Sequence, residues 1–253
     1  MKVIALGTGT SQGIPLIGCT CPVCCSEDSD DKRLRSSIYV QSQAAAIVID
    51  IGPDFRQQFI TNKLTSIDAI FITHEHNDHI IGIDEVRAIN FTQRKSIPIY
   101  ASERVCQAIR QRFAYVFDSN PYPGAPQIEL IPIDHNVLSF KDLTITPIDI
   151  KHGNLDIFGY RINNLGYITD ASEIPEKEME KLKDLELLIL NALRKEKHHA
   201  HFNLEAALEK IELLRPQIAY LTHISHNMGI TKEWSSELPE NVFSLVDNLT
   251  LEI

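Results

Sequence analysis

Short apolar runs recur along the chain and alternate in places with amphipathic stretches. Apolar runs of about four to eight residues are typical of β-strands, whereas apolar residues spaced three or four apart are typical of helices. The first pattern predicts strands at residues 2–6, 36–41, 45–50, 69–73, 98–101, 127–133, 143–150, 157–162, 166–170, 185–190 and 217–222. The second predicts helices at residues 54–62, 81–90, 103–113, 175–182 and 204–214.

The order of these elements predicts an α/β fold. Strand pairs come early, closely spaced strands fill residues 128–170, and strands then alternate with helices. Such an order favours two sheets packed face to face with helices on the outside. No repeat, low-complexity segment or linker-like break interrupts it, so we predict a single domain over residues 1–253.

One polar segment stands directly after a buried apolar run. Residues 73–79 read THEHNDH, in which three histidines and an aspartate fall within six positions. Residues two apart in a strand point to the same side, so we expect His74 and His76 to project together. Asp78 and His79 begin the next helix and can point back across the same space. Imidazole and carboxylate groups suit zinc, manganese or iron, and two pairs of ligands indicate two ions rather than one. A histidine-rich solvated loop is the alternative, which the four ligands after a buried strand disfavour.

Further metal-capable residues follow other predicted strands. His152, Asp170 and His223 each stand at or just after the end of an apolar run. Open α/β folds gather their sites at the carboxyl ends of strands. Any one of these residues could be an ordinary hydrogen-bonded core or loop residue. Their repetition at strand ends indicates a shared site.

Composition and charge narrow the classes of partner. Of 253 residues, 43% are hydrophobic and 23% are charged, and 34 acidic against 24 basic residues give a net charge of −10. Nucleic-acid-binding proteins usually carry a basic face, so a long polyanion is not the expected partner. The first apolar stretch is too short for a signal peptide, and no window approaches the length of a membrane span. We therefore expect a cytoplasmic protein without a membrane partner.

The glycine-rich segment GTGTSQG at residues 7–13 does not have the spacing of a nucleotide-binding loop. A Rossmann fingerprint needs its third glycine where Gln12 stands, and a P-loop needs a Gly-Lys-Ser/Thr sequence that is absent. We expect a tight turn that lets loops approach a site closely.

Four of the five cysteines fall in GCTCPVCC, at residues 18–25. In a reducing compartment such a cluster indicates a metal site before it indicates disulfides. Three thiolates, those of Cys19, Cys21 and Cys24, leave one position open in tetrahedral zinc. Cys25 is awkwardly placed for the same chelate because it adjoins Cys24, and His226 is the better fourth ligand. A cluster of free buried thiols is the alternative.

Together these motifs resemble the metallo-β-lactamase superfamily. THEHNDH matches the superfamily's H-x-H-x-D-H signature, and GTGTSQG and the three strand-end residues stand in the expected order. The resemblance implies an αββα four-layer sandwich, and His76 points to a hydrolase because a di-iron branch carries a carboxylate there. It implies that one ion is held by His74, His76 and His152, and the other by Asp78, His79 and His223, with Asp170 bridging.

Within that superfamily the chain resembles the PhnP-type cyclic phosphate phosphodiesterases. The matching segments are residues 6–26, 33–37, 50–58, 73–79 and 221–227. The resemblance assigns a structural zinc to Cys19, Cys21, Cys24 and His226. It implies that two divalent ions, Mn²⁺ or Zn²⁺, serve hydrolysis of a small cyclic phosphodiester such as 5-phosphoribosyl 1,2-cyclic phosphate. A homodimer stays open.

The resemblance also implies a histidine outside the metal shells that protonates the departing ribose oxygen. His201 precedes Phe202 and the start of a predicted helix, as the corresponding family position does. We expect His201 to be the general acid and Asp78 to be both a ligand and a catalytic residue. The register through His198 and His199 leaves either as an alternative, although both fit a solvated loop.

Several residues beside these motifs are expected to support the fold. For the residues that match family segments we favour structural pairing over a grip on phosphate; they are Arg33, Arg35, Ser36, Ser37, Asp54 and Arg56. Asp50 could orient a ligating histidine. Asp84 and Arg87 are expected to form a salt bridge, and Cys106 to be a small core residue.

Two other functions are alternatives to the phosphodiesterase. A tRNase Z-like endoribonuclease shares the ligands and the GTGTS start, but no basic RNA-binding arm is visible and the cysteine cluster weighs against it. A non-catalytic metal-binding scaffold would be expected to have lost ligands. We therefore predict a small-molecule phosphodiester as the partner.

Overall fold

The computed structural model describes residues 1–253 and contains two seven-stranded sheets. The first sheet contains β1 (Lys2–Gly7), β2 (Ser37–Gln41), β3 (Ala46–Ile49), β4 (Ala69–Phe71), β5 (Ile97–Ala101), β6 (Ile128–Pro132) and β14 (Thr250–Glu252). The second contains β7 (Leu138–Phe140), β8 (Leu143–His152), β9 (Leu155–Ile162), β10 (Leu165–Ile168), β11 (Leu187–Asn191), β12 (Ile218–Thr222) and β13 (Val242–Ser244).

The helices are short and mostly lie between strands. The α-helices are α1 (Pro22–Cys25), α2 (Phe55–Thr61), α3 (Asn77–Ile80), α4 (Val86–Gln93), α5 (Glu103–Arg112), α6 (Glu176–Met179), α7 (Leu204–Leu214) and α8 (Thr231–Ser235). Single 3₁₀ turns are η1 (Ser29–Asp31), η2 (Ile81–Glu85), η3 (Ala114–Val116), η4 (Glu180–Leu182) and η5 (His226–Met228). None of the helices combines the length and the apolar composition needed to cross a bilayer.

Both sheets are mixed. The first has the order β14-β1-β2-β3-β4-β5-β6 and is parallel from β3 to β6, and the second has the order β13-β12-β11-β10-β9-β8-β7 and is parallel from β10 to β13. The remaining neighbours in each sheet are antiparallel. Because parallel strands end at the same edge, each sheet directs several strand ends to one side.

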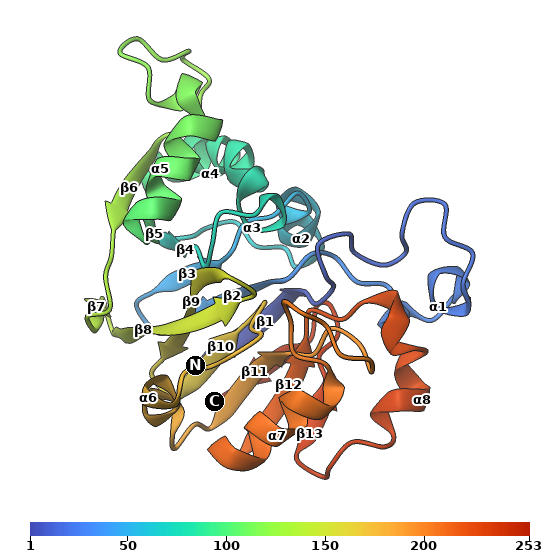
Figure 1. Cartoon of the computed structure of the whole chain (residues 1–253). Coiled ribbons are helices and arrows are strands. Elements are labelled where there is room, and N and C mark those ends of the chain that lie inside the picture. Colours follow the sequence, from blue (N-terminus) through green and yellow to red (C-terminus); the bar gives the residue numbers. More distant parts are fainter.

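The two sheets pack face to face around a shared apolar core. Phe71 of β4 and Tyr160 of β9 come from different sheets, and their ring centroids lie 5.6 Å apart. Helices α2, α4 and α5 bury residues in a second apolar cluster on the outer face of the first sheet, and α7 and α8 do the same on the second sheet. Figure 1 shows the resulting order of helices, sheet, sheet and helices. The predicted αββα four-layer sandwich is confirmed.

The sequence pattern located the long elements well. Each of the eleven predicted strands overlaps an observed one, and the three missed strands, β7, β13 and β14, have three residues each. So few positions do not establish a period of two, which explains the omission. Helices α1 and α8 were missed because they have four and five residues.

Two predicted elements differ in detail around the THEHNDH segment. Strand β4 ends at Phe71 and not at residue 73, because the Thr73 amide donates to Asp50 Oδ1 at 2.8 Å and not to a neighbouring strand. His74 and His76 therefore lie in the loop after the strand, so strand alternation does not explain their common direction. The helix predicted at residues 81–90 is a 3₁₀ turn followed by α4.

Candidate metal centre

The metal-capable residues meet where strands of both sheets end. Asp50 follows β3, His74 lies beyond β4, His152 ends β8, Asp170 follows β10 and His223 follows β12. Asp50, Asp170 and His223 have positive φ angles of 63°, 59° and 58°. This conformation costs a non-glycine residue about 1–3 kcal/mol and is concentrated at functional sites. The fold therefore stores backbone strain where these side chains converge.

The first predicted ligand set is assembled in the structure. One nitrogen from each of His74, His76 and His152 lies within 4.8 Å of the others, and His74 Nε2 is 3.0 Å from His76 Nδ1. Burial and the neighbouring His79 lower the pKa of His74 well below its ordinary value. A neutral ring keeps a lone pair, which is the form that binds a metal.

The second predicted set is linked through Asp170. Its Oδ2 lies 3.3 Å from both His79 Nε2 and His223 Nδ1, and His79 Nε2 is also 3.1 Å from Asp78 Oδ2. His74, His79 and Asp170 form another group of donors within 4.8 Å of one another. Asp170 thus lies between the two sets. Within the second set, His223 lies beside Asp170 itself, whereas Asp78 lies beside His79.

Asp50 fixes the orientation of His79. Its Oδ2 accepts a hydrogen bond from His79 Nδ1 at 2.7 Å. His79 Nε2 is buried and forms no hydrogen bond, although oxygens of Asp78 and Asp170 lie close to it. Burial alone would lower the pKa of His79, but the carboxylates of Asp50, Asp170 and Asp78 together raise it well above its ordinary value. The surroundings of Nε2 therefore favour positive charge. Nitrogen and oxygen donors in this field fit divalent cations, which the two sets would hold.

His201 lies beside both sets. Its ring centroid is 4.6 Å from that of His152 and 5.0 Å from that of His223, and Nδ1 is 3.8 Å from Asp170 Oδ1. With His152 and Asp170 it forms a third group of donors within 4.8 Å. His198 is one ring further out, 5.1 Å from His201 by centroid. Burial and the nearby His223 lower the pKa of His201 to about 3.

The cysteine cluster lies apart from this centre. The thiol groups of Cys19, Cys21 and Cys24 are 3.4, 3.4 and 3.6 Å from His226 Nδ1. The Cys24 amide bonds to the Cys21 sulfur, and this hydrogen bond lowers the pKa of Cys21 to about 6. Cys25 is exposed. Three sulfur atoms around one imidazole nitrogen have the composition of a structural zinc site.

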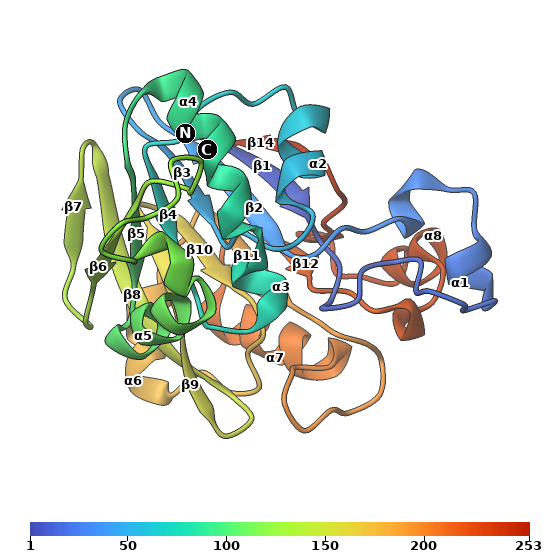
Figure 2. The same cartoon turned by 90° about the horizontal axis from the view of Figure 1, so that it is seen from above.

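The part of the chain that contains α1 and α8, called here the α1–α8 lobe, is joined to the two sheets through the buried side chain of Arg33. Figures 1 and 2 show α1 and α8 together at one side of the molecule. Arg33 is 2% exposed and donates to Thr8 Oγ1 at 2.8 Å and Thr231 Oγ1 at 3.1 Å. Thr8 in turn donates to Asp247 Oδ1 at 2.6 Å. Arg33 therefore has the structural role expected of it.

Four of the other five residues of the family segments also pair within the fold, whereas the pairing expected of Arg56 was wrong, because its side chain is exposed and has no hydrogen-bond or ion-pair partner. Arg35 and Asp54 form an ion pair at 3.2 Å, Ser36 Oγ lies 3.2 Å from His223 Nδ1, and Ser37 donates to the Asp50 carbonyl. Gly52 is required for close approach, because a Cβ there would stand 2.1 Å from the Asp78 carbonyl oxygen. The expected pairing of Asp84 with Arg87 is present at 3.2 Å, and Cys106 is a buried core residue.

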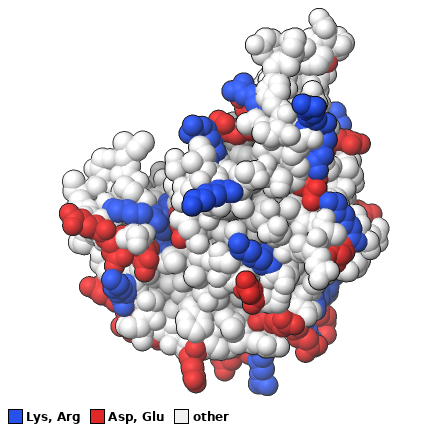
Figure 3. All heavy atoms as spheres, turned by 180° about the vertical axis from the view of Figure 1, so that it is seen from behind, with Lys and Arg blue, Asp and Glu red and all other residues white.

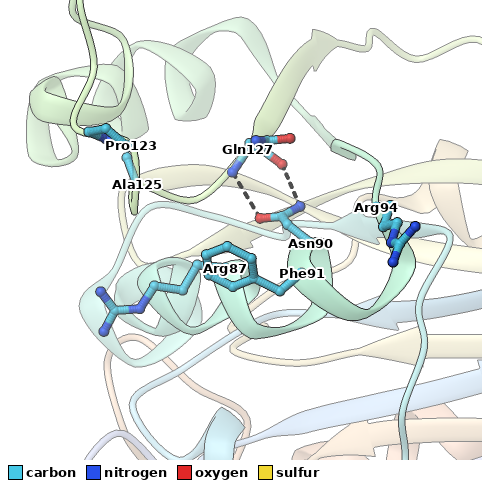
Figure 4. Close-up of a pocket in the computed structure, with 7 residues that line it drawn as sticks. All are labelled: Arg87, Asn90, Phe91, Arg94, Pro123, Ala125 and Gln127. Carbon is cyan, nitrogen blue, oxygen red and sulfur yellow. Dashed lines mark hydrogen bonds between the residues drawn. The ribbon is translucent and has the colours of Figure 1, made fainter.

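A separate surface cavity of about 390 Å³ lies beside α4; Figure 4 shows the residues that line it. Asn90 exchanges hydrogen bonds with the Gln127 backbone across its floor, and the lining includes Arg87, Phe91 and Arg94. No predicted ligand lines this cavity. On the face shown in Figure 3 acidic and basic side chains are interspersed, and no continuous basic field is visible.

Comparison with known proteins identifies the class. A family model described as a beta-lactamase superfamily domain matches residues 45–224. A crystal structure described as a new diphosphatase from the PhnP family is 37% identical, with a TM-score of 0.93 and coverage of 99% of this chain and 96% of the other. The chain therefore belongs to the metallo-β-lactamase superfamily, whose metal-dependent hydrolases share this fold. Within it the chain is a PhnP-type member, as the sequence motifs predicted.

Two curated relatives carry other names. The octanoyltransferase of Porphyromonas gingivalis is 40% identical over 252 residues, which are 98% of this chain and 51% of that protein. A ribonuclease Z of Macrococcus caseolyticus is 34% identical over 168 residues, which are 64% of this chain and 49% of that protein. The chain thus spans about half the length of these relatives.

The structure adds residues that the sequence did not indicate. Thr73 donates to both oxygens of Asp50, Thr169 Oγ1 donates to Asp170 Oδ2 at 2.7 Å, and the Ala200 carbonyl accepts from His152 Nδ1 at 2.8 Å. Such contacts orient ligands. The adjacency of each threonine to a ligand or ligand partner was the only signal in the sequence. Ala200 had none.

Proposed function

We propose that this protein is a two-metal phosphodiesterase that hydrolyses a small cyclic phosphodiester, such as 5-phosphoribosyl 1,2-cyclic phosphate. The observation that carries the proposal is the convergence of His74, His76 and His152 in one group of donors, beside Asp170 with His79 and His223. Likeness to a diphosphatase of the PhnP family across nearly the whole chain supports it.

The chain's own residues would divide the chemistry. The two ligand sets would hold divalent ions, which when bound would supply an activated water and positive charge for the phosphoryl oxygens. Asp170 lies between the two ligand sets and holds them in one geometry, and Asp50 keeps His79 Nε2 turned inward. Asp78 serves as a ligand at the helix start. His201, which is 11% exposed, faces the centre and would donate a proton to the departing ribose oxygen.

His201 would take up the proton that it donates only when the substrate binds. Burial lowers its pKa to about 3, so the ring is neutral near pH 7 before substrate binds. An anionic phosphate beside the ring would favour the protonated form. We propose that binding and proton loading occur together.

The remaining assignments form part of the same proposal. The active-site ions are Mn²⁺ or Zn²⁺, and Cys19, Cys21, Cys24 and His226 hold a structural Zn²⁺. Three sulfur ligands require reduced cysteines, which accords with a cytoplasmic location. The partner is a small-molecule phosphodiester, and a homodimer is compatible with this arrangement.

An RNA substrate is the main alternative, because ribonuclease Z is among the relatives. A polynucleotide is bound largely through basic contacts to phosphates. The net charge of −10 disfavours such binding, and the one face shown in Figure 3 carries no continuous basic field. One or two phosphates can be met by metal ions and a few side chains, without an extended surface.

The decisive experiment compares kcat/KM for ribose 1,2-cyclic phosphate, 2′,3′-cyclic nucleotides, an organic diphosphate and a pre-tRNA at one salt concentration. We expect the ribose cyclic phosphate to be preferred. Preference for pre-tRNA would overturn the small-substrate proposal. Preference for cyclic nucleotides or the diphosphate would retain a phosphoester hydrolase and discard the particular ester. The absence of turnover would favour the metal-binding scaffold.

A further inference from the structure

Helix α5 contacts the loop of residues 73–79, which carries His74 and His76, on the side away from the metal centre. Glu75 stands between His74 and His76, and its side chain is 19% exposed. Arg104 donates to Glu75 Oε1, and Arg112 donates to the Glu75 carbonyl oxygen. The residue between the two histidines is therefore held through both its carboxylate and its backbone.

Arg104 also reaches the segment that supplies the third histidine of the first set. Its second guanidinium nitrogen donates to the Asp156 carbonyl oxygen. Asp156 pairs with Lys151 across the β8–β9 hairpin, and the next pair joins His152 to Leu155. One planar guanidinium thus joins the loop bearing His76 to the hairpin bearing His152.

The helix gives this guanidinium a fixed base. Ser102 Oγ accepts from the Val105 amide and caps α5, while Val105 and Ile109 are fully buried against the outer face of the first sheet. Two hydrogen bonds between hairpin and loop lie on the strand side of the ligands: the Phe158 amide donates to the Thr73 carbonyl, and the Tyr160 hydroxyl donates to the Ile72 carbonyl at 2.7 Å. Arg104 contacts the part beyond them, next to the ligands.

We infer that Arg104 is a positioning residue for one ion of the pair, the ion held by His74, His76 and His152. The inference rests on the proposed two-metal function. A half-exposed ion pair contributes little to folding stability, because solvent screens it and both side chains lose freedom. Its geometric effect differs, since groups that orient metal ligands commonly change metal affinity about 10–100-fold. The second ligand set makes no contact with Arg104 and serves as an internal reference.

The test is a titration with Mn²⁺ alone, by calorimetry and electron paramagnetic resonance, on protein that retains the zinc of its cysteine site. His76→Ala and His223→Ala assign the two binding steps to their ligand sets. For Arg104→Ala we expect the step of the first set to weaken about 10–100-fold and the other to change less than about threefold. Activity lost at limiting Mn²⁺ should return in excess Mn²⁺.

Two further variants distinguish the bonding geometry of Arg104 from its charge and from a general effect of losing an arginine on α5. Arg104→Lys keeps the charge but cannot bond both acceptors through a planar fork, so it should restore only part of the affinity. Arg110, on the same helix, lies over the Phe117 ring at 5.1 Å, and Arg110→Ala should leave both steps unchanged.

Three outcomes would overturn the inference. Wild-type affinity at both steps in Arg104→Ala would remove the positioning role while leaving the proposed function intact. Equal weakening of both steps, with a lower Tm of Mn²⁺-free protein, would reduce the arginine to a support of the fold. If the wild-type chain bound no Mn²⁺ or Zn²⁺ at these histidines, this inference and the proposed function would fail together.

Discussion

The pKa values of His74 and His79 are shifted in opposite directions, although their rings are 4.1 Å apart by centroid. Burial dominates at His74 and lowers its pKa, whereas three carboxylates reverse the effect of burial at His79 and raise it. The difference follows from hydrogen-bond partners, since Asp50 contacts His79 and the Thr73 hydroxyl lies beside His74 Nδ1. Residue type alone therefore does not determine the direction in which the pKa of each histidine is shifted.

His201 provides the first residue-scale prediction. His201→Ala should keep both active-site ions yet lose about 10²–10⁴ in kcat on the ribose cyclic phosphate, as removal of a general acid usually does. The loss should shrink for a p-nitrophenyl ester, whose leaving group scarcely needs a proton. Steady-state kinetics with elemental analysis checks both points, and His199→Ala is the matched control. Loss of metal from His201→Ala would make His201 a ligand.

Asp247 provides a pH prediction. Burial raises its pKa from 3.8 to about 6, so the native state binds more protons than the unfolded state between those values. Its stabilising contribution is therefore full below pH 3.8 and is lost as the pH rises through 6. Because Asp247 is partly exposed, wild type should gain only about 1–2 kcal/mol over Asp247→Asn between pH 6.5 and 4.5. Urea unfolding at these pH values measures it, and parallel curves would contradict it.

At the scale of elements, the sequence predicts the strands and helices that have a periodic apolar pattern. It does not predict those whose position depends on contacts with distant segments. The runs at β3 and β11 are long enough to be recognised, and α7 has a clear apolar face. Strand β14 pairs with β1 from the other end of the chain, so no local pattern marks it. The end of β4 was misplaced because a side chain, Asp50, replaces the sheet partner of Thr73.

The lobe of α1 and α8 provides the element-scale prediction. Cys21→Ser or His226→Ala should remove zinc and lower the Tm by about 5–10 °C, because structural zinc contributes folding free energy directly. Activity should fall only indirectly. Calorimetry and zinc analysis measure the effect, and Cys25→Ser, at the exposed neighbouring cysteine, is the control. Wild-type Tm and zinc content in either ligand variant would contradict the assignment.

At the scale of the whole molecule, the sequence indicated the candidate ligands but not their supports. His74, His152 and His223 are predicted as ligands because they recur at strand ends and stand in the order of the family motifs. Their supports come from segments far away in the chain, as Ser36 does for His223 and Ala200 for His152. Only the packing of the two sheets brings these segments together. A single sequence without its fold carries no signal for such pairs.

The packing of the two sheets also provides the last prediction, that residues 1–253 unfold as one domain. Phe71 lies in the first sheet and contacts Tyr160 of the second, while the single tryptophan, Trp234, is buried beside the second sheet. Phe71→Ala should cost about 3–5 kcal/mol, because it leaves a cavity in the shared core. In one cooperative unit that loss shifts every probe equally.

The measurement is urea unfolding of metal-loaded protein, followed by Trp234 fluorescence and by far-UV circular dichroism. Both midpoints should fall together in Phe71→Ala. The side chain of Phe91 is 69% exposed. Phe91→Ala should therefore leave both midpoints nearly unchanged, with a loss of unfolding free energy of no more than about 0.5 kcal/mol. If the fluorescence midpoint stayed at its wild-type value while the dichroism shifted, the two sheets would unfold separately. The ligand sets would then come from two units, because each set combines residues of both sheets.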